Sequence, residues 1–355
     1  MPSSLFSPLS IRSVTFRNRI VVSPMCEYSS VDGFANDWHL VHLGSRAVGG
    51  AGAVITEATA VTADGRISPD DLGIWKDEHI TMLARIFAFV AGQGAVPGVQ
   101  LAHAGRKAST AAPWRGRANV AVDHGGWTPI YAPSAVAFTP EYQTPVALDG
   151  ESIREIATAF GEGARRVLEA GGQLIEIHAA HGYLLHSFLS PLSNTRDDEY
   201  GGTFENRTRI VREVVGAVRR VWPESLPLFI RISATDWTEG GWTGEDSVAL
   251  AAQVKPLGVD VVDCSTGGNV ARATIPVGPG YQVRFAEQVK REAGILTAAV
   301  GMITDPQQAE GVVASGQADL VLLARQFLRD PYWPLHAAGV LGAEPPVPVQ
   351  YQRAF

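Results

Sequence analysis

The chain has 355 residues, a formal net charge of -7 at pH 7, and no run rich in lysine or arginine. This length is enough for one large α/β barrel or two ordinary domains with an ample core. The acidic balance argues against nucleic acid or an anionic membrane surface as a partner. We therefore expect a small-molecule partner.

The chain contains only two cysteines, Cys26 and Cys264. Two are too few for a disulfide framework or a cysteine-ligated iron–sulfur cluster. No apolar run approaches the ~18 residues that a membrane-spanning helix needs, and the N-terminus lacks the pattern of an export signal. We expect a cytoplasmic protein without a membrane partner.

Residues 5–18 alternate apolar and polar positions and are interrupted by Pro8 and Ser13, which predicts a small N-terminal hairpin. Beyond it, eight short apolar runs alternate with helical patterns. The expected strands are 20–23, 53–57, 97–101, 174–177, 228–232, 259–263, 296–300 and 320–323. The expected helices are 36–48, 78–92, 151–169, 203–221, 245–255, 281–292, 305–314 and 331–340.

Strand–helix alternation of this kind predicts an α/β fold with a parallel sheet, and eight units favour a single (β/α)8 TIM barrel over residues 1–355. An open doubly wound sheet is the competing fold. It is disfavoured because no Gly-x-Gly-x-x-Gly sequence follows a strand and opens a helix.

The connection after the third strand, at about 104–148, is rich in Pro, Trp, Ala and Tyr and has little periodicity. Connections this long in a compact protein are usually functional. We expect this excursion to be a lid or cap over the site.

Three polar side chains, His178, His181 and Tyr183, follow the strand expected at 174–177. The carboxyl ends of parallel barrel strands are where function gathers. From these residues alone, structural packing, small-molecule catalysis and a metal site remain as alternatives. A zincin motif is excluded because two alanines stand between the histidines and the glutamate base is missing.

The other expected strand ends add further polar groups and glycines to the same face. They are Cys26, Tyr28, Gln100, His103, Arg231, Cys264, Ser265, Gly267, Gly268, Gly301, Ala324 and Arg325. Loops after strands seven and eight often bind phosphate. Gly301 and the Ala324–Arg325 pair could do so here, or they could form a turn and a surface ion pair.

Arg231 stands on a strand that should be buried on both faces, so its charge needs a partner. A polar heterocycle or a neighbouring carboxylate could supply one. The histidines can donate hydrogen bonds to a carbonyl or nitro oxygen, and Tyr183 can act as a general acid. No hydrolytic triad stands out, and Lys107 is expected to be a structural or lid residue, so reduction is favoured over acyl transfer.

Four segments resemble the Old Yellow Enzyme family of flavin ene-reductases, and most closely its YqjM-like (thermophilic-like) branch. They are SPMCEY at 23–28, GVQLAHAGRK at 98–107, HAAHGYL at 178–184 and SPLSNTR at 190–196. The resemblance extends over essentially the whole chain, from Leu5 to Phe355.

This resemblance implies a barrel that holds FMN noncovalently, accepts electrons from NADPH or NADH, and transfers a hydride to activated alkenes. The alkenes would be α,β-unsaturated ketones, aldehydes, imides or nitroalkenes. Matched by motif, the residues at the flavin ring and ribityl chain are Ser23, Pro24, Met25, Ala58, Gln100 and Arg231. Those at the phosphate are Gly301, Ala324 and Arg325.

The same resemblance implies roles around the substrate. His178 and His181 would bind the substrate oxygen, Tyr28 would reach the substrate, and Tyr183 would donate the proton, without a metal. Cys26 would lie beside the flavin and tune its potential. An ordinary buried thiol is the alternative for Cys26.

The tail, 345–355, resembles that branch in its last residues, and there the tail arginine reaches a neighbouring subunit's site. Arg353 would then be an intersubunit residue that binds substrate, in a homodimer or a dimer-built tetramer. A frayed terminus is the alternative. Two positions depart from the branch: Ala324 replaces a glycine, and Phe355 replaces a tryptophan.

Three rival functions can be stated. A dienoyl-CoA reductase of the same fold would need a longer chain with a group of cysteines. A metal-dependent barrel hydrolase would use His103, His178, His181 and Asp263 as ligands. A flavin-binding protein without catalysis is the third.

Overall fold

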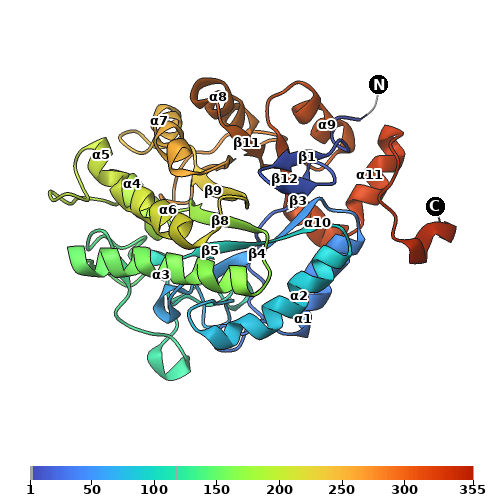
Figure 1. Cartoon of the computed structure of the whole chain (residues 1–355). Helices are drawn as coiled ribbons and strands as arrows, with labels where there is room; N and C mark the ends of the chain where they lie inside the picture. The colour runs from blue at the N-terminus through green and yellow to red at the C-terminus, as the bar shows by residue number, and fades with distance from the viewer. Residues whose placement is uncertain (1–2, 117, 355) are drawn as a thin grey trace.

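The computed structural model describes residues 3–116 and 118–354. Eight parallel strands form a closed barrel in which β3 pairs with both β4 and β12 (Figure 1). The strands are β3 Ile20–Val22, β4 Ala53–Ala60, β5 Val96–Ala102, β8 Leu174–Ala179, β9 Leu228–Ser233, β10 Val261–Ser265, β11 Leu296–Ala299 and β12 Leu320–Leu323. The predicted (β/α)8 fold is confirmed.

Eight helices of nine residues or more cover the outside of the barrel. They are α1 Asp37–Val48, α2 Ile80–Gly92, α3 Gly150–Glu169, α6 Arg209–Val221, α7 Gly244–Val254, α8 Val283–Ala293, α9 Pro306–Ala314 and α11 Trp333–Leu341. Side-chain caps begin several of them. Asn36 forms a capping box at α1, and Asp149 accepts from Ser152 N at α3.

The helix predicted at 203–221 is two helices, α5 Phe204–Arg207 and α6. Thr203 caps α5, and Thr208 joins the two. A second difference concerns β4, which we expected to end at Glu57. It continues to Ala60 because Ala58, Thr59 and Ala60 pair with β5, and the buried Glu57 carboxylate within it lies 3.2 Å from His39 Nε2.

The predicted hairpin is formed by β1 Leu9–Ile11 and β2 Val14–Phe16. Its buried side chains Ile11, Val14 and Phe16 pack against the interior residues of the barrel strands. Phe16 stacks on Phe229 of β9 with ring centroids 6.2 Å apart. The hairpin therefore closes the amino end of the barrel, so only the carboxyl end can open.

The excursion after β5 carries three short 3-10 helices and a pair of two-residue strands. They are η3 Gly105–Lys107, η4 Pro113–Arg115, η5 Val122–His124, β6 Tyr131–Ala132 and β7 Val146–Ala147. Ala104, Ala108 and Ile130 form a small apolar cluster against which Tyr183 packs. The excursion thus contacts the loop that follows β8.

Among the described residues, three α-helices are shorter than these eight. They are α4 Leu184–Leu189, α5 and α10 Arg325–Arg329. Within residues 3–116 and 118–354, none of the helices has both the length and the apolar composition needed to cross a bilayer.

Candidate active site

His178 lies at the carboxyl end of β8 and is almost fully buried. Its Nδ1 accepts a hydrogen bond from the main-chain N–H of Ala180 at 3.3 Å. Burial lowers the pKa of His178 well below its ordinary value, and the positive charge of Arg231 adds to this effect. The ring is therefore neutral at pH 7, and its proton is on Nε2, where it can be donated.

His181 is held in a left-handed backbone conformation, with φ of 60°. Its N–H donates to Ser233 Oγ at 2.9 Å, and its Nε2 lies 2.7 Å from Ser265 Oγ. Lys107 Nζ donates to the carbonyls of His181 and Gly268, at 2.8 and 2.9 Å. Non-glycine residues adopt this conformation only when their surroundings enforce it. Hydrogen bonds with residues of β9, β10 and the excursion therefore hold this turn in place.

Tyr183 completes the group that follows β8. The His178 ring lies 5.1 Å from the Tyr183 ring and 5.3 Å from the His181 ring, edge to face in both cases. Burial raises the pKa of the Tyr183 phenol well above its ordinary value, and the nearby Cys26 and Tyr28 contribute further. The phenol is therefore protonated at neutral pH and can donate its proton.

Tyr183 also lines a cavity of about 110 Å³ that lies between the loop after β3 and the excursion. The lining residues are Tyr28, Ile67, Lys107, Thr110, Ala111, Tyr142 and Tyr183. Tyr28, like His181, has positive φ, at 49°. Backbone strain of this kind clusters at functional sites. Two tyrosines predicted at the substrate therefore face one cavity.

Cys26 is partly buried, and its thiol accepts a hydrogen bond from the main-chain N–H of Ala58. Burial raises the pKa of the thiol well above its ordinary value, and the charges of Asp71 and Glu57 raise it further. Cys26 is therefore a neutral thiol, and its environment is the opposite of that of a nucleophilic cysteine.

Arg231 on β9 occupies the barrel interior. Its Nη1 donates to Ser23 Oγ at 2.8 Å, and its Nε lies 3.1 Å from Asp263 Oδ2 on β10. Two strands of the same barrel carry a second polar pair, in which Gln100 Nε2 on β5 donates to Glu176 Oε1 on β8 at 2.7 Å. The sequence allowed either a polar heterocycle or a neighbouring carboxylate as the partner of Arg231. The structure supplies the carboxylate. Sequence reasoning missed Glu176, which it treated only as part of a strand.

A second cavity, of about 290 Å³, lies beyond β11 and β12. It is lined by Ser265, Tyr281, Gln282, Val300, Gly301, Met302, Ile303, Thr304, Leu322, Ala324, Arg325, Gln326 and Arg329. Gly301 has φ of 118°, and a Cβ there would lie 2.7 Å from Gln282 Nε2. A glycine is needed at 301, and the structure brings it together with Ala324 and Arg325. Arg329 is a second cation that the sequence did not indicate.

Arg353 is exposed and does not line either cavity. The preceding residues 346–350 line a different cavity with Val48, Gly92 and Gln93. These three residues lead into the amino ends of β4 and β5, opposite the carboxyl face, and the tail projects beyond α11 (Figure 1). Arg353 therefore does not join the site of its own chain. Phe355 lies outside the described residues.

The ligands that a metal hydrolase would use have other partners. His103 Nδ1 accepts from Gly105 N at 3.1 Å, and Asp263 pairs with Arg231. In the part of the chain that the structure describes, no three His, Cys, Asp or Glu side chains converge as a metal ion would require.

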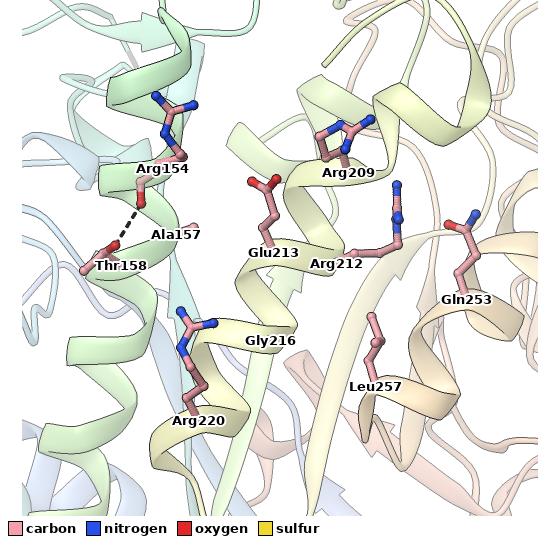
Figure 2. A pocket seen from close by; sticks show the side chains of 10 residues that line it. All are labelled: Arg154, Ala157, Thr158, Arg209, Arg212, Glu213, Gly216, Arg220, Gln253 and Leu257. Atoms are coloured by element: carbon pink, nitrogen blue, oxygen red, sulfur yellow. Dashed lines mark hydrogen bonds between the residues drawn. The ribbon is translucent and has the colours of Figure 1, made fainter. Parts of the chain in front are cut away.

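A cavity of about 770 Å³ lies on the outer surface, away from the strand ends. Figure 2 shows Arg154 on α3 and Arg220 and Glu213 on α6 along one side, with Arg212 and Gln253 across α6. Arg212 donates to the carbonyl of Glu205 at 2.8 Å, so part of the positive charge around this cavity stabilises the junction of α5 and α6. We assign the chemistry to the carboxyl face instead, because the perturbed histidines and tyrosine are there.

A closed barrel with an interior arginine, a cavity beyond β11 and β12, and neutral proton donors at the carboxyl ends of its strands is the arrangement of a barrel enzyme with its active site at that face. The sequence profile of the NADH:flavin oxidoreductase / NADH oxidase family matches residues 4–342. The chain belongs to this family, within its Old Yellow Enzyme group, and is an oxidoreductase that uses FMN and a nicotinamide dinucleotide.

The relatives cover the chain fully. An NADPH dehydrogenase of Geobacillus sp. (strain WCH70) is 51% identical, over 100% of this chain and 99% of its own length. One from Bacillus subtilis (strain 168) is 47% identical, with both chains covered completely. The solved structure of morphinone reductase is 25% identical with a TM-score of 0.80, over 97% of this chain and 91% of the other.

Proposed function

We propose that this protein reduces activated C=C bonds of α,β-unsaturated ketones, aldehydes, imides and nitroalkenes at the expense of NADPH or NADH. One observation carries the proposal. A neutral imidazole with its proton on Nε2 and a protonated phenol lie 5.1 Å apart, ring to ring, at the open end of a flavin-family barrel. This pair can bind a substrate oxygen and deliver a proton to carbon.

The residues around the mouth fit FMN. Arg231 and Gln100 are buried polar side chains in the barrel interior, and the 290 Å³ cavity supplies Gly301, Ala324 and Arg325 for a phosphate. Ser23, Pro24, Met25 and Ala58 would complete the contacts with the ring and ribityl chain. When bound noncovalently there, FMN supplies the hydride that goes to the β-carbon of the alkene.

His178 and His181 would bind the substrate oxygen. Negative charge grows on that oxygen as the β-carbon receives hydride, and donors already in place stabilise it. His178 can donate from Nε2. For His181 to donate from Nε2, it must exchange its contact with Ser265 for one with the substrate, because its Nε2 lies 2.7 Å from that hydroxyl.

Tyr183 would protonate the α-carbon, and Tyr28 would contact the substrate from the other side of the 110 Å³ cavity. The raised pKa of the Tyr183 phenol keeps the proton available at neutral pH. Cys26, a neutral thiol bonded to the Ala58 N–H, would lie beside the flavin and tune its potential.

We place the working enzyme in the cytoplasm as a homodimer or dimer-built tetramer. Cys26 and Cys264 are both free, which suits a reducing compartment. Arg353 is exposed on a tail that leaves the amino side of its own barrel. A role at the substrate would therefore require the site of a neighbouring subunit.

The test is anaerobic turnover of the FMN-loaded protein with NADPH and 2-cyclohexen-1-one, a maleimide or a nitroalkene. We expect the flavin absorbance to bleach with NADPH and to return when the alkene is added, with saturated product formed. If the flavin is reduced but none of the three alkenes reoxidises it, the alkene reductase assignment is wrong.

A further inference from the structure

Two carboxyl groups, Glu176 on β8 and Asp263 on β10, meet inside the barrel. Both side chains have zero exposed fraction. The two carboxyl groups lie close enough to interact, and the charged group facing them is Arg231 of β9, whose Nε lies 3.1 Å from Asp263 Oδ2. Gln100 of β5 is a neutral neighbour and donates to Glu176 Oε1 at 2.7 Å.

The charges in this cluster do not balance if both acids are ionised. Arg231 supplies one positive charge, and two carboxylates in contact would leave one negative charge buried without a counterion. Such a charge is costly in an apolar interior, so one acid of such a pair retains its proton. A proton on Glu176 Oε2 also gives a donor to Asp263, and Oε1 remains free to accept from Gln100.

We propose that Glu176 and Asp263 hold one proton between them at neutral pH, and that this proton keeps the cluster around Arg231, a residue that would contact FMN, electrically neutral. Glu176 and Asp263 are thus positioning residues. They orient Arg231 and set the field that it exerts on the cofactor. This inference rests on the FMN site of the proposed function, but not on the alkene chemistry.

The titration of the pair supports this reading. Burial raises the pKa of Glu176 to about 8, and the charge of Asp263 contributes. Burial also raises the pKa of Asp263, to about 6, against the effect of Arg231. The shared proton is therefore held at pH 7 and lost as the pH rises through about 8, which adds one negative charge to the cluster. The midpoint potential of FMN should then fall more steeply with pH, because a negative field opposes electron uptake.

Infrared spectroscopy of the holoenzyme at pH 7 counts the proton directly. In difference spectra between the wild type and each variant, we expect a wild-type carboxylic C=O band that shifts in D2O and is lost in both Glu176→Gln and Asp263→Asn; Asp71, a buried acid whose pKa burial also raises, is common to all three proteins and cancels. Each variant leaves one acid beside Arg231, and that acid ionises to balance the guanidinium. The absence of this difference band for either single variant would overturn the proposal.

The midpoint potential provides a second readout. Both single variants should keep a potential near the wild type at pH 7 but lose the extra fall above about pH 8. The double variant, Glu176→Gln with Asp263→Asn, leaves Arg231 uncompensated and should raise the potential. A double variant with unchanged potential contradicts the proposal, and if it does not fold, the single variants still decide.

These outcomes are separable from the proposed function. Neither measurement needs an alkene, so failure to reduce alkenes does not affect them. If the protein did not bind FMN, the infrared count on the protein alone would still test the shared proton, whereas the effect of the pair on the cofactor would fail together with the FMN site.

Discussion

Lys107 Nζ donates a 2.8 Å hydrogen bond to the main-chain carbonyl of His181. A second bond, to the carbonyl of Gly268, ties the excursion after β5 to the loops after β8 and β10. The sequence suggested a structural or lid role for Lys107, and these two hydrogen bonds are what that side chain contributes. The side chain supports the strained turn at His181, one of the two histidines that we propose bind the substrate.

Replacing Lys107 with Met should therefore loosen this turn. Two charge-assisted hydrogen bonds are lost from a part-buried site, and we expect the free energy of unfolding to fall by roughly 2 kcal/mol. Affinity for a phenolic ligand should fall as well. Denaturant unfolding and ligand titration measure the two effects, with Lys290→Met as a control far from the mouth. Equal ligand affinity in both variants would show that the turn does not depend on Lys107.

Tyr183→Phe should slow alkene reduction by roughly 10²-fold or more, since general acid catalysis typically contributes that much. Flavin reduction by NADPH should be unaffected, because it needs no proton from the phenol. Stopped-flow measurement of the two half-reactions separates these rates. An unchanged alkene half-reaction would mean that solvent can replace Tyr183 as the proton donor.

Arg325→Ala should weaken FMN binding by roughly 10- to 100-fold, the range expected for loss of one charge-assisted phosphate contact. Titration of the flavin-free protein with FMN measures this. Riboflavin, which has no phosphate, is the control ligand, and its affinity should not change. If both ligands weakened equally, Arg325 would be supporting the fold rather than the phosphate.

Acid stability should depend on Asp236, which is fully buried. Burial alone would raise the pKa of Asp236, but the His186 ring, whose Nε2 lies 3.1 Å from Asp236 Oδ1, and hydrogen bonds from Ser190 and the Trp242 N–H lower it to about 2. The folded pKa is below the unfolded value, so this contribution is full above about pH 4 and is lost as the pH falls through 2.

Asp236→Asn should remove that dependence and destabilise the protein at pH 7 by about 2 kcal/mol or more. Unfolding followed from pH 7 to pH 2 compares the variant with the wild type. If both lost stability in parallel over the acid range, other carboxylates would account for it.

Arg353→Ala should lower activity if the tail completes a neighbouring site. A mixture with Tyr183→Phe subunits provides the sharper test. In a mixed dimer, the Arg353→Ala subunit has an intact Tyr183 and receives Arg353 from its partner, so one complete site is restored. We expect activity well above that of either variant alone after subunit exchange. No recovery, with mixed dimers shown by mass spectrometry, would place Arg353 outside the active site.

Much of the fold could be predicted because its signals are local. Each strand is a short apolar run followed by a helical pattern, and parallel strands place their carboxyl ends on one face. This was enough to gather Tyr28, Arg231 and the group after β8 without knowing any contact between them. The cap at Asp149 could be predicted for the same reason, since it depends only on the next three residues.

The remaining features depend on contacts between distant parts of the chain, which only the closed barrel decides. Glu176 was expected to be just one residue of an apolar strand, and its pairing with Asp263 depends on the strand register and on the closure that places β8 and β10 either side of β9. β4 continues past Glu57 because its backbone pairs with β5 up to Ala60, and a histidine of α1 supplies the partner for the buried Glu57 carboxylate. The amino acid sequence by itself determined which groups reach the mouth. The tertiary structure decided which of them are charged, because burial and the charges of neighbouring strands determine pKa values.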